Sequence, residues 1–174
     1  EPCEFKEWEK RFSVPLVIVD RDAARDYPGV WLVRSSDEQA MELAIAHLQE
    51  RGCRKIGCIV HGAPGPGNAD IRFRAIRKSL QDHGLPADDS LIHYSADEQY
   101  VEIIGKLLRR GIDALFCPGG SGGIIAAYAL SLFNRRIPED ISLIASEQTF
   151  FSRYGVPPQT TISPDYKALA ASTA

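Results

Sequence analysis

The glycine-rich sequence Gly119-Gly120-Ser121-Gly122-Gly123 is the first candidate for a functional site. It joins a short apolar segment at 113–118 to an almost wholly apolar helix expected at 124–133. A strand that ends in glycines and opens directly into a helix leaves backbone N–H groups available to a ligand above the edge of a sheet. Equally, the glycines could only turn the chain tightly and let the helix pack close to its strand. The sequence leaves both interpretations open.

Ser121 could act as a nucleophile only with a base beside it. The histidines are expected mid-helix, at a strand end, near a helix end and in a strand, for His47, His61, His83 and His93 respectively. Nothing in the sequence brings one of them to Ser121, and the His-Glu-x-x-His and Walker motifs are absent. Residues 119–123 match the Gly-x-Ser-x-Gly spacing, but without a histidine partner this match does not make a nucleophile elbow. We therefore predict no catalytic residue and no enzyme. His61 follows a strand beside the glycine loop at 62–67 and is the histidine expected near a pocket, although a structural role is more common there.

Composition argues against several other functions. The 174 residues are 44% hydrophobic with a net charge of −3, which suits a buried core but not a nucleic-acid-binding surface. The four cysteines form no Cys-x-x-Cys pair, so we expect reduced, mostly buried thiols, no metal site and no cofactor. No segment approaches the ~18 apolar residues of a membrane span, and residues 1–11 do not resemble a signal peptide. These features predict a cytoplasmic protein.

Apolar and amphipathic segments alternate along the chain. Strands are expected at 14–19, 30–33, 55–60, 91–94, from residue 113, at 141–145 and at 159–162. Helices are expected from Ser36 or Asp37 to Gly52, from the glycine loop to Gly84, at 97–110, at 124–133 and from Pro164. This alternation predicts an α/β fold with a mostly parallel sheet covered by helices on both faces.

Four motifs carry a resemblance to a known family. They are Gly52-Cys-Arg-Lys-Ile-Gly57, Arg72 with Leu80 and Gly84-Leu-Pro86, Ile137-Pro-Glu-Asp-Ile-Ser142, and Pro157-Pro-Gln-Thr-Thr-Ile162. Each motif is weak alone, but together, over about residues 14–168, they resemble the effector-binding domain of the LacI/GalR family of bacterial transcription regulators. The resemblance implies a two-lobed fold like that of the type I periplasmic sugar-binding proteins.

The resemblance also implies how the chain is divided. Residues 1–50 are expected to be a remnant of the first lobe with a crossover, 51–145 the second lobe, and 146–174 the return crossover with the start of a terminal helix. The family's DNA-binding head and the opening elements of its first lobe have no counterpart here. The missing head could be a helix-turn-helix or a winged-helix module.

Two ligand contacts are implied where the sequence matches the family. Asp20, at the end of its strand, stands where members often place a carboxylate that accepts sugar hydroxyls, although it could be a solvated strand-end residue. Arg72 fits the arginine of the helix that follows the glycine loop, and its guanidinium suits hydroxyls, carboxylates or phosphates. The alternative for Arg72 is an ordinary surface arginine.

The departures from the family pattern concern the same site. Gly119-Gly120 replaces the usual Asn-Asp, and Glu147, within Ser146-Glu-Gln148, stands where an aspartate is typical. These changes point either to a different effector or to a domain that no longer binds one. Because a negative charge is lost and Arg72 would be unopposed, we expect an anion such as a sugar phosphate or sugar acid to be favoured over a neutral sugar. Asp20 and Glu147 act in the opposite direction.

The favoured function is the ligand-sensing domain of a bacterial transcription regulator. A sugar or sugar derivative between two lobes would modulate DNA binding by a head that this chain lacks. The alternative is a solute-binding protein of a transporter. We also expect a two-fold homodimer, because the helix near 124–133 carries more apolar surface than one sheet face can cover and the family uses this element as an interface. Its expected interface residues are Ile124, Ile125, Tyr128 and Leu132.

Overall fold

The computed structural model describes residues 11, 16–19, 30–119, 121–146 and 150–173. The chain forms two compact units, one of residues 1–36 with 164–174 and the other of residues 37–163. The predicted lobe boundaries, after residue 50 and after residue 145, stay predictions. In the larger unit the helix at 37–50 covers one face of the sheet, and the strand at 160–162 extends it.

The smaller unit contains two parallel strands and a short helix. Strand β1 (Leu16–Val19) pairs with β2 (Val30–Val33), with Leu16 opposite Val30. Helix α7 (Tyr166–Ala171) begins after Asp165, whose carboxylate accepts the backbone N–H groups of Lys167 and Ala168. The sequence placed the start of this helix at Pro164. The cap explains why the helix begins two residues later.

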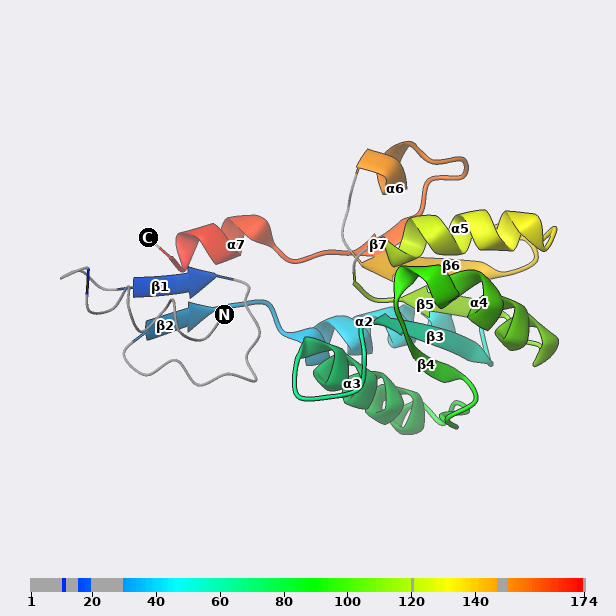
Figure 1. Cartoon of the computed structure of the whole chain (residues 1–174), viewed down its shortest axis with the longest axis horizontal. Helices are drawn as coiled ribbons and strands as arrows, with labels where there is room; N and C mark the ends of the chain where they lie inside the picture. Colours follow the sequence, from blue (N-terminus) through cyan, green and yellow to red (C-terminus); the bar gives the residue numbers. More distant parts are fainter. Residues whose placement is uncertain (1–10, 12–15, 20–29, 120, 147–149, 174) are drawn as a thin grey trace. The chain divides into compact units, whose positions relative to one another are not determined.

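The larger unit is built on a five-stranded sheet in the order β4-β3-β5-β6-β7 (Figure 1). Every pair of neighbouring strands is parallel, as predicted. The strands are β3 (Ile56–His61), β4 (Ile92–Ser95), β5 (Ala114–Cys117), β6 (Ser142–Ser146) and β7 (Thr160–Ile162).

Helices cover both faces of this sheet. Helices α2 (Asp37–Glu50) and α3 (Asn68–Asp82) pack on one face, and α4 (Tyr100–Arg109) and α5 (Gly122–Leu132) pack on the other. Side chains alternate along each strand, so Cys58 and Val60 of β3 join the core under α2 and α3, whereas Ile59 joins the core under α4 and α5. The predicted fold class is therefore confirmed.

Two further segments complete the larger unit. A 3₁₀ turn (Asp97–Gln99) precedes α4, and the short helix α6 (Phe150–Tyr154) precedes β7. Sequence periodicity did not predict α6. Five residues are too few to show a helical repeat, and most of the apolar side chains of this helix are exposed rather than arranged on a buried face.

The amino-terminal edge of the sheet is held together by aspartates. Asp113, just before β5, accepts the backbone N–H groups of Arg54 and Lys55 at 2.7 and 3.0 Å. Asp140, just before β6, accepts three hydrogen bonds from Arg136, one from its backbone and two from its guanidinium. These bonds tie each strand's start to a neighbouring segment and assign a structural role to two of the motifs found in the sequence.

Three of the four cysteines lie in the described part of the larger unit. Cys53, Cys58 and Cys117 are buried free thiols. Burial raises the pKa of Cys58 and of Cys117 well above the ordinary thiol value, so both remain protonated and unreactive. This agrees with the predicted reduced, buried thiols.

Candidate ligand-binding site

The candidate site lies at the carboxyl-terminal edge of the larger sheet. His61 ends β3, the loop 62–67 leads from it into α3, and Gly119 follows β5. Helix α2 also begins at this edge, because it runs back across the sheet before β3 starts. The parallel topology therefore brings together three segments that are far apart in the sequence.

Arg72, in the second turn of α3, forms an ion pair with Asp37, the first residue of α2. Its Nε donates to Oδ1 of Asp37 at 2.6 Å. The Arg72 side chain is 26% exposed and that of Asp37 is 11% exposed, so solvent screens this pair less than the surface pairs of the same unit. Arg72 is thus an inter-helix contact rather than a free surface arginine.

Gly119 lies directly against the Arg72 guanidinium. Its φ is +94°, and a Cβ at this position would stand 2.7 Å from Nη1 of Arg72 and 3.6 Å from Cβ of His61. The backbone N–H of His61 also donates to the carbonyl of Pro118 at 3.4 Å. Arg72, His61 and Gly119 therefore converge; the positive φ favours glycine at 119, and a side chain there would displace the guanidinium.

The other glycines of the motif have a different role. A Cβ on Gly122 would stand 2.6 Å from Oη of Tyr100, and one on Gly123 would stand 2.3 Å from Cβ of Ala145. Both glycines let α5 approach α4 and β6 closely. Ser121 occupies the N-cap position of α5, but its side chain makes no capping hydrogen bond. The close-packing interpretation thus applies to Gly122 and Gly123, and the ligand-binding interpretation of the motif stays a prediction.

The first turns of α3 are held by aromatic contacts. Phe73 stacks on Tyr94 of β4 with ring centroids 4.4 Å apart and an interplanar angle of 7°. The Tyr94 hydroxyl donates to Oδ1 of Asp70 at 3.2 Å, and burial together with this carboxylate raises the pKa of Tyr94. The Arg77 guanidinium lies 4.9 Å from the centroid of the Phe73 ring. These contacts fix the helix that carries Arg72.

Asp20, Gly120 and Glu147 lie outside the described residues, and their roles remain predictions. Ser121 and His61 lie at the predicted edge, with His61 exposed. The expectation that Arg72 is unopposed is wrong, because Asp37 neutralises it. Sequence analysis considered Asp37 only as a helix cap. The contact of Asp37 with Arg72 spans 35 residues. The sequence offers one clue to it: in a parallel sheet, α2 and α3 must both begin at the same edge.

His83 and His93 bond to residues other than Ser121. His83 contacts Oε1 of Gln49 at 2.5 Å and Oε1 of Glu42 at 2.7 Å, and His93 contacts the carbonyl of Ser90 at 3.1 Å. Ser79 also donates to Glu42, and both contacts lower the pKa of that carboxylate. The carboxylate of Glu42 lies between the Ser79 hydroxyl and the His83 imidazole. The imidazole therefore cannot activate Ser79 as a nucleophile.

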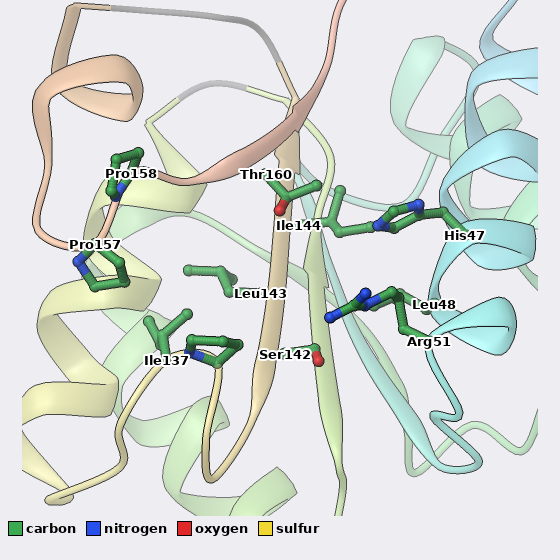
Figure 2. Close-up of a pocket in the computed structure, with 11 residues that line it drawn as sticks. His47, Leu48, Arg51, Ile137, Ser142, Leu143, Ile144, Pro157, Pro158 and Thr160 are labelled. Atoms are coloured by element: carbon green, nitrogen blue, oxygen red, sulfur yellow. The ribbon is translucent and has the colours of Figure 1, made fainter.

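Figure 2 shows a pocket of about 310 Å³ elsewhere in the larger unit. His47 and Arg51 of α2 line one side, Pro157 and Pro158 the other, and Leu143 and neighbouring β6 residues lie between them. His61, Arg72 and Gly119 do not line it. The candidate site is therefore an open edge rather than this pocket.

Among the described residues, no group of three or more His, Cys, Asp or Glu side chains could hold a metal ion. Among the same residues, no helix combines the length and the apolar character needed to cross a membrane.

Comparisons with known proteins identify the family. Residues 45–174 match the periplasmic binding protein-like domain. The chain is 29% identical to the HTH-type transcriptional regulator DegA of Bacillus subtilis, over 91% of this chain and 47% of DegA. It is 27% identical to the ribose operon repressor of Halalkalibacterium halodurans, over 97% of this chain and 50% of the repressor. The chain thus spans about half the length of the curated relatives it matches.

Solved structures agree with this assignment. A LacI-family regulator from Sanguibacter keddieii superposes with a TM-score of 0.76 at 26% identity, over 91% of this chain and 60% of the other. A LacI-family regulator from Lactobacillus casei with bound glucose gives a TM-score of 0.79 at 20% identity, over 99% and 66%. The relatives named are transcription regulators, which agrees with the prediction that the chain is not an enzyme. The chain belongs to the periplasmic binding protein-like domain family and resembles the effector-binding domains of LacI-family transcription regulators.

Proposed function

We propose that this chain is the ligand-sensing part of a bacterial transcription regulator and that it binds a sugar or sugar derivative. The carboxyl-terminal edge of the larger sheet is its site on this unit. The observation that carries the proposal is the convergence of Arg72, His61 and Gly119 at that edge. Open α/β sheets bind ligands at the carboxyl ends of their strands.

The donors at this edge suit a polyhydroxylated molecule. A guanidinium offers several N–H groups in a fixed plane, and His61 is exposed beside it. The predicted contacts Asp20, Gly120, Ser121 and Glu147 belong to the same proposal. The glucose complex of the Lactobacillus casei regulator supports a sugar as the ligand class.

In the whole protein, effector binding would bias the relative closure of two lobes and so change DNA binding by another domain. Such a regulator acts in the cytoplasm on operator DNA, and the reduced thiols suit that compartment. The alternative, a solute-binding protein of a transporter, receives less support because the curated relatives are regulators.

A thermal-shift screen of the full-length protein tests this proposal. Neutral sugars, sugar acids and sugar phosphates are added separately, and a ligand at ~100 times its Kd should stabilise the fold by about 2.7 kcal/mol. We expect at least one member to raise the Tm and to change operator binding in a gel-shift assay. A panel without any stabilising member would contradict the proposal.

We also propose that α5 and α6 form the interface of a homodimer. Ile124, Tyr128 and Leu132 of α5 are 38%, 61% and 53% exposed, and Ile125 lies beside them, half-buried. Helix α6 contacts α5 and adds exposed aromatic side chains, namely Phe150, Phe151 and Tyr154. Exposed apolar surface of this extent is typical of an interaction site.

Sedimentation of the full-length protein at micromolar concentration tests the dimer. We expect a dimer, and we expect Leu132→Glu to dissociate it because the substitution places a charge in an apolar interface. The matched control is Leu43→Glu, which changes a leucine of similar exposure (55%) on α2 and should leave the dimer intact. A monomeric wild-type protein would contradict the proposal.

A further inference from the structure

We propose that Asp37 determines the charge specificity of the site: it neutralises Arg72, so that the site accepts a neutral, hydroxyl-bearing ligand and rejects a phosphate or carboxylate. This inference rests on the proposed function, because it concerns the ligand class of the same edge. It reverses the preference for anions that the sequence alone suggested.

The first step is the geometry of the ion pair. Asp37 takes the Nε–H of Arg72 at 2.6 Å, which leaves the Nη groups as the donors that remain for a ligand. Asp37 is 11% exposed, so its negative charge acts on the site with little screening by water.

The second step is the position of the Arg72 guanidinium beside Gly119. A Cβ at residue 119 would stand 2.7 Å from Nη1, so the guanidinium occupies the space that a side chain at 119 would fill. Stacking of Phe73 on Tyr94 fixes the helix that carries Arg72. An anion that drew the guanidinium toward itself would break the ion pair between Arg72 and Asp37.

The third step is the balance of charges. A ligand oxygen that accepts from an Nη group also lies near the Asp37 carboxylate, so an anion meets attraction and repulsion together. A neutral hydroxyl accepts the same N–H groups without that repulsion. The amino end of α5 contributes roughly half a positive charge, so removal of Asp37 would make the site more positive.

Inorganic phosphate is the probe, and its binding to the full-length protein is measured by calorimetry at constant ionic strength. We expect no detectable binding to the wild-type protein and clear binding to Asp37→Asn, with an affinity at least about tenfold above the detection limit. The added substitution Arg72→Ala should abolish that gain. The matched control is Asp89→Asn, which frees Arg77, an arginine on the same helix as Arg72, from its aspartate and should gain no phosphate affinity.

Two results would overturn the inference: phosphate binding by the wild-type protein, which needs no variant to fold, or a gain in Asp37→Asn that persists without Arg72. These results are distinct from failure of the proposed function. If no sugar stabilises the wild-type protein, the sensor proposal fails whatever phosphate does. If a sugar binds and a phosphorylated sugar binds equally well, only the charge specificity fails.

Discussion

The two edges of the larger sheet use the same residue types for different purposes. At the amino-terminal edge, Asp113 and Asp140 accept backbone N–H groups, and Arg136 is only four residues from its partner. At the carboxyl-terminal edge, Asp37 and Arg72 are 35 residues apart, and the guanidinium lies against Gly119. At one edge the aspartates satisfy the chain's own donors, two of them across 58 and 59 residues, and the other edge presents donors beside a glycine.

The difference shows that an Asp–Arg pair alone does not indicate function. At the amino-terminal edge the aspartates satisfy the chain's own donors and thereby start the strands. At the carboxyl-terminal edge the pair links two helices, and only the Nε of Arg72 is engaged by Asp37. Substitutions at the first edge should therefore alter stability, whereas those at the second should alter ligand binding.

The largest effect is expected for Asp113→Ala. The substitution leaves the backbone N–H groups of Arg54 and Lys55 without their acceptor and should lower the free energy of unfolding by roughly 3 kcal/mol. Denaturant unfolding measures the loss, and Asp113→Asn, which keeps one acceptor oxygen, should lose about half as much. Loss of effector affinity with unchanged stability would contradict the structural role given to Asp113.

A smaller effect, on binding rather than on stability, is expected for Arg72→Ala. Loss of the guanidinium should weaken effector binding by about 2 kcal/mol, because a charged donor to a ligand contributes about that much. Calorimetry with the effector from the thermal-shift screen measures this. Arg74→Ala is the control, since Arg74 is 71% exposed and pairs with Asp70 on the same helix. Equal affinity of the two variants would return Arg72 to a purely structural role.

The smallest effect is expected at low pH. Hydrogen bonds from the Arg136 guanidinium, then from its backbone, hold the pKa of Asp140 well below its ordinary value of 3.8. A carboxyl group whose pKa is lower in the folded state stabilises the fold above its unfolded pKa, and this contribution is lost as the pH falls toward the folded pKa. Asp140→Asn should therefore make the loss of stability between about pH 5 and about pH 3 shallower. Denaturant unfolding at the two pH values measures it, and an unchanged loss would contradict the assignment.

Much of the fold could be predicted from the sequence because it depends on local patterns. Alternating apolar strands and amphipathic helices predicted the parallel sheet, and four motifs in register predicted the family. The partner of Arg72 could not be predicted, because the contact with Asp37 depends on how α2 and α3 pack. The separate roles of Gly119 and Gly123 also depend on neighbours distant in the sequence, Arg72 and Ala145.

Hydrogen exchange of the full-length protein, with and without the sugar that raises its Tm most, tests the difference between the two edges most directly. We predict that the effector slows exchange at the carboxyl-terminal edge, in residues 61–67 and 119–123. Exchange at the amino-terminal edge, around Asp113 and residues 140–142, should not change. Protection at the amino-terminal edge, with none near Arg72, would contradict the assignment of the ligand-binding site.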